Sequence, residues 1–345
     1  MTRDEIAAWV EDGAEAPVAL ALSERLKPVN EDGVIFPPTY ASTPPYVIDT
    51  LADGTKVALI DSVGSQANRM EPIFKEPPYA ELVPQITIKA GNHKAISLFE
   101  VGHRVADALV RSSRPLSEKV SEAFDALAEG NAEPMAKLAP TSLVFGVWDS
   151  RGEGMKVPRL VNSVIRAFDV SVLHRSATYI PPLMPEEYAE VAGFKKEELE
   201  KAEGDSKNPL AKAGFVHVPS TNDPGGVIAR GDILRTATVN LVALRRIEGD
   251  NASALRRYIL GLALVAATWP QDGFLRQGCL LTRDPEAPPR WELVHRDGRR
   301  QAVELSHDDA LVFAKAAADE FGVGEGMTAE FDPKLAREVL KKAKG

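Results

Sequence analysis

The chain has 345 residues and a hydrophobic fraction of 44%, enough for one large domain or two ordinary domains with a packed core. A single cysteine, Cys279, excludes an internal disulfide framework and is typical of a reducing compartment. The net charge of −9 argues against a uniformly basic surface. It does not exclude nucleic-acid binding, because charge distribution decides where a polyanion lies. The start lacks a signal-peptide core and no apolar run is long enough to span a bilayer, so we expect a cytoplasmic protein without a membrane partner.

The first half of the chain alternates between strand-like and helix-like patterns. Expected strands cover residues 18–29, 82–89, 141–148 and 170–180, and expected helices cover residues 59–74, 97–111, 117–129 and 157–168. Ser117 is placed as an N-cap, and Pro158 lies in a first helical turn, where its missing N–H is tolerated. The recurring order of strand, helix and strand predicts an α+β fold with a split βαβ core.

The second half begins with an acidic, poorly periodic segment over residues 181–209, which we expect to be an exposed insertion. Pro224, Gly225 and Gly226 lie between two strand-like runs and predict a type II turn at the tip of a projecting hairpin. A core strand is expected over 238–245, a buried helix over 252–268, a strand over 279–283 and a hairpin over 291–305. Ser306 and Asp309 form a capping box for a helix that ends at Phe321.

Two of the expected helices carry a polar stripe at spacings of three and four residues. The members are Ser62, Ser65, Gln66 and Arg69 in the first, with Asn68 beside them, and Arg159, Asn162, Ser163 and Arg166 in the second. Hydroxyl, amide and guanidinium donors suit phosphate oxygens, so the stripes predict a polyanion site. Two amphipathic helices with ordinary solvated faces fit the same pattern equally well.

Positive charge is concentrated in two segments of this acidic chain. Residues 151–175 hold five Lys or Arg against two Asp or Glu, and residues 230–257 hold six against three. Arginine favours bidentate phosphate contacts, so the cluster predicts polyanion binding. Its members are Arg151, Lys156, Arg159, Arg166 and Arg175, to which Arg230 and Arg235 are added from the second segment. Tyr179 is either a base-stacking residue or a core residue.

Several common sites are not supported by the sequence. The glycine run over 322–326 follows a helix and lacks dinucleotide-binding spacing, and no phosphate-binding P-loop is present. The six histidines form no metal-ligand pattern, so no metal and no cofactor are expected. His174 beside Arg175 is compatible with acid–base cleavage of RNA, but no second histidine or lysine pairs with it, which favours a structural or RNA-stacking role.

Six short segments resemble the backbone subunit of type I-G (formerly I-U) CRISPR effectors, in the Cas-seven branch of the RAMP superfamily. They are residues 61–71, 145–152, 156–163, 174–177, 235–245 and 255–258. The resemblance implies a single RAMP-type domain over 1–345, with an RRM-like (ferredoxin-like) palm. It also implies a helical finger insertion near 75–140, and an acidic insertion with a β-hairpin thumb near 181–235.

The same resemblance implies a non-catalytic subunit that binds CRISPR RNA and polymerises head to tail along the guide. Its expected partners are copies of itself, the target DNA strand, other effector-complex subunits and a recruited helicase–nuclease. Such a subunit grips phosphates and sugars, because backbone contacts carry no sequence information. The alternatives are an endoribonuclease that processes precursor CRISPR RNA through His174 and a scaffold that does not bind RNA.

Overall fold

The computed structural model describes residues 1–149 and 154–342. Its main layer is a nine-stranded sheet within that part of the chain, and every pairing in this sheet is antiparallel. The strand order is β14 (Phe274–Arg276), β15 (Cys279–Arg283), β1 (Ala19–Pro28), β13 (Ile233–Asn240), β10 (Val161–Phe168), β4 (Lys56–Asp61) and β3 (Ile48–Thr50). Strands β16 (Arg290–Val294) and β17 (Arg300–Val303) extend the sheet beside β1. The structure thus confirms a mixed α+β fold.

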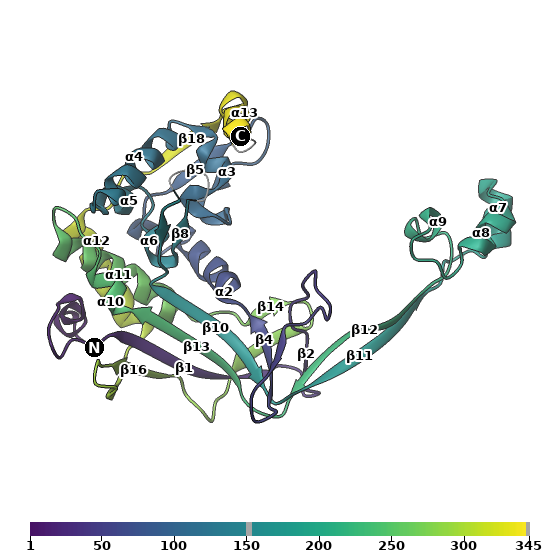
Figure 1. The fold of residues 1–345 in the computed structure, drawn as a ribbon, viewed down its shortest axis with the longest axis horizontal. Coiled ribbons are helices and arrows are strands. Elements are labelled where there is room, and N and C mark those ends of the chain that lie inside the picture. The colour runs from purple at the N-terminus through teal and green to yellow at the C-terminus, as the bar shows by residue number, and fades with distance from the viewer. Residues whose placement is uncertain (150–153, 343–345) are drawn as a thin grey trace.

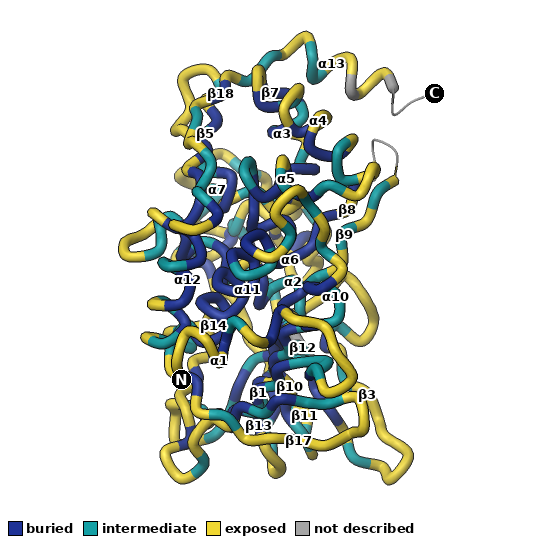
Figure 2. The backbone as a smooth tube through the Cα atoms, turned by 90° about the vertical axis from the view of Figure 1, so that its left-hand side faces the viewer, coloured by how far each residue is buried: buried dark blue, intermediate teal, exposed yellow. Residues whose placement is uncertain are grey.

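One face of this sheet is covered by helices. Alternate residues of β13 are buried, as a half-covered strand requires. Helix α11 (Ala252–Thr268) is buried continuously from Tyr258 to its end and lies between the sheet and α12 (His307–Phe321), which confirms the buried helix expected over 252–268. Gly261 allows close helix packing, because a Cβ there would lie 2.8 Å from Cα of Ala314. Figure 2 shows the buried core running through α11 and its neighbours.

A second lobe stands above the sheet in Figure 1. Its sheet contains β6 (Ile96–Ser97), β5 (Ile86–Lys89), β18 (Met327–Phe331) and β7 (Ser113–Arg114). Its helices are α3 (Ala108–Arg111), α4 (Leu116–Ala128), α5 (Glu133–Leu138), α6 (Thr141–Phe145) and α13 (Pro333–Lys342). The 3-10 helices η3 (Ala80–Leu82), η4 (Leu98–Glu100) and η5 (Arg104–Ala106) connect these elements. Other helical elements of the body are α1 (Arg3–Ala7), η1 (Ala8–Val10), α2 (Val63–Met70), η2 (Glu71–Lys75) and α10 (Leu241–Arg245).

A long two-stranded arm leaves the body and extends away from it (Figure 1). It is formed by β11 (Val170–Tyr179) and β12 (Val218–Ala229), and β2 (Val34–Ile35) pairs with β12 at its base. The acidic segment folds at the far end into α7 (Pro185–Ala192), α8 (Lys196–Ala202) and α9 (Pro209–Lys212). These helices share a small core of Leu199, Ala202, Ala211 and Val216.

Several expected elements differ from the structure. Residues 157–168 form β9 (Lys156–Val157) and strand β10 rather than a helix, and β-branched residues line this strand. A spacing of four residues is even, so Asn162 and Arg166 share a face in a strand as well as in a helix. Residues 141–148 form α6 and then β8 (Val147–Trp148), because α6 packs against α5 and α11 and tertiary contacts override strand propensity.

Other boundaries are also corrected. The helix expected over 59–74 starts at Val63 after β4, residues 97–111 form short helical turns, and the helix expected from Ser117 starts at Leu116. Residues 238–245 divide between β13 and α10, and the acidic insertion contains helices. The hairpin over 291–305 and the capping box of Ser306 with Asp309 are confirmed.

Candidate nucleic-acid interface

The start of α2 uses its hydroxyl groups as a cap. Ser62 is the N-cap, its Oγ accepts a hydrogen bond from the backbone N–H of Ser65 at 3.2 Å, and the two Oγ atoms are 3.0 Å apart. Asn68 is exposed on the same helix. The hydroxyl groups thus satisfy the first turn of α2, as Ser at an N-cap does in general.

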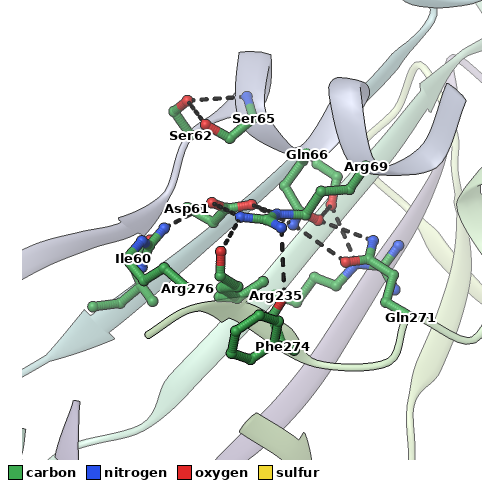
Figure 3. Close-up of polar contacts among 12 residues, drawn as sticks. Ile60, Asp61, Ser62, Ser65, Gln66, Arg69, Arg235, Gln271, Phe274 and Arg276 are labelled. Atoms are coloured by element: carbon green, nitrogen blue, oxygen red, sulfur yellow. Dashed lines mark hydrogen bonds and ion pairs between the residues drawn. The ribbon is translucent and has the colours of Figure 1, made fainter. Parts of the chain in front are cut away.

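A buried carboxylate ties α2 to the sheet (Figure 3). Asp61, at the end of β4, is fully buried and accepts hydrogen bonds from Nε2 of Gln66 at 2.7 Å, Nε of Arg69 at 3.0 Å and Nη2 of Arg276 at 3.0 Å. Arg69 also donates to the carbonyl oxygen of Leu275. A buried charge is stable only when it is paired and hydrogen-bonded in this way.

The same network continues across the sheet. Ser163 donates through Oγ to Oε1 of Gln66 at 2.8 Å, and Nε of Arg235 donates to Ser163 Oγ at 3.2 Å. Arg235 also donates to Glu24 and to the carbonyl oxygen of Ala267, both at 3.0 Å. The two predicted polar rows therefore meet, but through buried side chains whose donors are used inside the protein. The expectation that Gln66 and Ser163 belong to exposed polar rows is wrong, and Arg235, predicted to bind RNA, is also buried.

The exposed members of the predicted set lie elsewhere. Asn162 and Arg166 are exposed on the face of β10 opposite Ser163. The side chains of a strand point to opposite faces in turn. This is why Asn162 and Arg166 are exposed while Ser163 is buried. Arg151 lies outside the described residues.

The arm carries a further group of the predicted residues. His174 and Arg175 are exposed on β11, and the guanidinium of Arg175 lies 5.7 Å from the ring centroid of Phe36. Arg230 donates to Oγ of Ser171 at 3.1 Å. Tyr179 is 49% exposed and donates to the carbonyl oxygen of Gly214, so it is not a core residue.

The predicted hairpin tip is wrong. Pro224, Gly225 and Gly226 lie within β12, where Pro224 is paired with His174 of β11. Close backbone approach explains the glycine at 225, because a Cβ there would lie 2.7 Å from the backbone carbon of His174. The residues that look like a turn therefore permit strand pairing, and the arm turns instead through the helical segment between β11 and β12.

A separate cavity of about 650 Å³ lies at the junction of η5, α6 and the β8–β9 hairpin. Lys156 and Arg159 line it, and so do Arg104 and Trp148, which the sequence reasoning missed. For Trp148 the available signal was an aromatic residue close in sequence to the basic residues Lys156 and Arg159. Lys156 holds its Nζ 4.7 Å from the ring centroid of Trp148. The structure therefore divides the predicted site among the cavity, the sheet face and the arm.

Two negative findings apply to residues 1–149 and 154–342. No group of three or more His, Cys, Asp or Glu side chains is arranged to hold a metal ion there. Nor does any helix in that range have the length and apolar character needed to cross a membrane.

Residues 20–172 match the family of CRISPR-associated protein GSU0053, which confirms the resemblance predicted from the sequence. The match begins in β1, includes α2, the cavity and β10, and ends near the start of the arm. No curated protein matches the chain.

Proposed function

We propose that the protein is a non-catalytic backbone subunit of a type I CRISPR effector complex, which binds CRISPR RNA, polymerises along it and supports recognition of target DNA. The matched family supports the CRISPR role. In this proposal the subunit works in the cytoplasm with other effector-complex subunits and a recruited helicase–nuclease.

The connectivity of the main sheet supports the RRM-like palm. In chain order, β1, α2, β10, β13, α11 and β16 follow the βαββαβ pattern of ferredoxin-like folds. These four strands are arranged in the sheet as β16–β1–β13–β10. On this basis residues 75–140 belong to the proposed finger and the arm is the proposed thumb.

The arm is the observation that carries the proposal. Its ten-residue strand β11 extends for about 33 Å at roughly 3.3 Å per residue, and residues 174–179 are all exposed. A two-stranded hairpin is marginally stable alone, so an arm of this length favours contact with a partner. A copy of the same chain related by a non-closing rotation would produce a filament along a single RNA strand.

The RNA-binding half of the proposal is tested by titrating a labelled repeat–spacer RNA at several salt concentrations. Because each neutralised phosphate of a single strand contributes a slope of about −0.7 in log K against log[salt], several basic contacts give a steep dependence. Equal affinity at low and moderate salt contradicts the proposal, and the absence of any complex favours the scaffold without RNA.

A further inference from the structure

We propose that the cavity beside the β8–β9 hairpin holds one nucleotide of a single-stranded RNA, with the base stacked on Trp148 and the phosphate at Lys156 and Arg159, an assignment that rests on the RNA binding proposed above. The cavity volume of about 650 Å³ lies within the range of roughly 300–1,000 Å³ found for small-molecule sites. It is therefore large enough for a nucleotide.

The aromatic wall of this cavity is Trp148. Its side chain is 58% exposed, although indole is among the most apolar surfaces that a protein can bury. Lys156 lies over the ring at 4.7 Å, which places a cation beside a stacking surface. Single-stranded RNA is recognised by this combination, because every base has a π-face and every nucleotide carries a phosphate.

The cavity is positively charged. Within the described residues its lining includes three side chains that carry permanent positive charge and no carboxylate. Lys156 and Arg159 make no ion pair with any described carboxylate, while Arg104 is neutralised by the buried Glu71, with Nε and Oε2 2.8 Å apart. Burial, and after it the charge of Arg104, lowers the pKa of Arg159. A phosphate here would stabilise these cations.

Arg104 provides an independent argument for ligand binding at this cavity. It adopts a left-handed backbone conformation with φ 51°, which is uncommon for a residue other than glycine. Its Nη1 donates to the carbonyl oxygen of Gly146 at 3.1 Å, but its Nη2 has no hydrogen-bond partner in the part of the chain that the structure describes. The side chain is only 6% exposed. A buried donor without an acceptor is costly, so a bound acceptor group is favoured.

Gly146 fixes the shape of the cavity floor. A Cβ at this position would lie 2.8 Å from Cγ of Arg159 and 2.9 Å from the carbonyl oxygen of Val157. The φ of 76° is also unfavourable for other residues. The absence of a side chain at Gly146 therefore lets Arg159 pack against this backbone, and Arg159 lines the cavity together with Lys156.

The test uses the full-length protein and a short labelled single-stranded RNA, with binding followed by anisotropy. Trp148→Ala is expected to weaken binding roughly five- to 150-fold, the effect of losing one stacked base. Trp148→Tyr retains an aromatic face and is expected to bind within a few-fold of the original chain. Tyr40→Ala removes a 40% exposed aromatic side chain outside the cavity and is the matched control.

Tryptophan fluorescence supplies a second readout. RNA is expected to quench the original chain, and the Trp148-dependent part of this quenching is absent in Trp148→Tyr. The nucleotide assignment is overturned if Trp148→Ala, Trp148→Tyr and Tyr40→Ala all bind RNA as the original chain does, and if RNA quenches Trp148→Tyr as strongly as the original chain. RNA binding itself would then still stand. If the original chain binds no RNA, the proposed function itself fails and the assignment fails with it.

Discussion

Arg235 and Arg166 provide a direct test of how the sheet divides structural from binding residues. They lie on adjacent strands, where Arg166 is paired with Leu234 and Arg235 with Ile165. Arg235 faces the helices with a side chain that is 4% exposed, whereas Arg166 is exposed on the opposite face. We expect Arg235→Ala to destabilise the fold and Arg166→Ala to weaken RNA binding.

The expected loss of folding stability in Arg235→Ala follows from the contacts of Arg235. Its guanidinium donates to Glu24 at 3.0 Å, to Ser163 and to the carbonyl oxygen of Ala267. Truncation leaves Glu24 buried, with Arg283 at 2.7 Å as its remaining ionic partner among the described residues. Removing one partner of a buried ion pair costs about 3–5 kcal/mol. An exposed substitution such as Arg166→Ala changes stability by roughly 0.5 kcal/mol or less.

Urea denaturation of both variants measures the free energy of unfolding, and salt titrations measure RNA affinity. For Arg166→Ala we expect an unchanged urea midpoint and a salt slope smaller in magnitude by about 0.7. For Arg235→Ala we expect a much lower midpoint. An Arg235→Ala protein with unchanged stability and selectively weakened RNA binding would refute the division between a structural network and an exposed face. So would an Arg166→Ala protein that unfolds but retains its affinity.

Three further predictions follow from the structure. Burial raises the pKa of Cys279 to about 11. An aromatic disulfide reagent at neutral pH should therefore react with this thiol only after denaturation. Rapid reaction of the native protein would contradict the burial of Cys279. The N-terminal ammonium and the Ser306 cap lower the pKa of Asp309 from its ordinary value. Asp309→Asn should therefore reduce stability at neutral pH by up to about 1 kcal/mol. This difference should shrink as pH falls through the folded pKa of Asp309, whereas a pH-independent difference would argue against a charge effect. Pure protein should leave labelled repeat RNA intact, and clean cleavage abolished by His174→Ala would establish the endoribonuclease alternative.

The sequence was most informative where local pattern and tertiary environment agree. Residues 258–267 of the helix Ala252–Thr268 are apolar on all sides, so the burial of this stretch follows from composition alone. The capping box at Ser306 is equally local, since its side-chain and backbone partners lie three residues apart. Such features are predictable because no distant contact is needed to define them.

Features that depend on distant contacts were not predictable in the same way. Ser163 was identified as part of a polar pattern, but its partners Gln66 and Arg235 lie far away in sequence, and only their pairing reveals that the row is buried. The glycines of β12 were misassigned because a turn and a close strand pairing both select glycine. Arg104 carried no sequence signal, since its backbone conformation is imposed by its surroundings.

The most direct test is the mass and nucleic-acid content of the purified assembly. The chain is co-expressed with a repeat–spacer transcript and analysed by size-exclusion chromatography with light scattering and absorbance at two wavelengths. We expect one particle that contains several copies of the chain on one RNA and falls apart when the RNA is digested. A single copy free of nucleic acid, with the transcript eluting separately, would contradict the account.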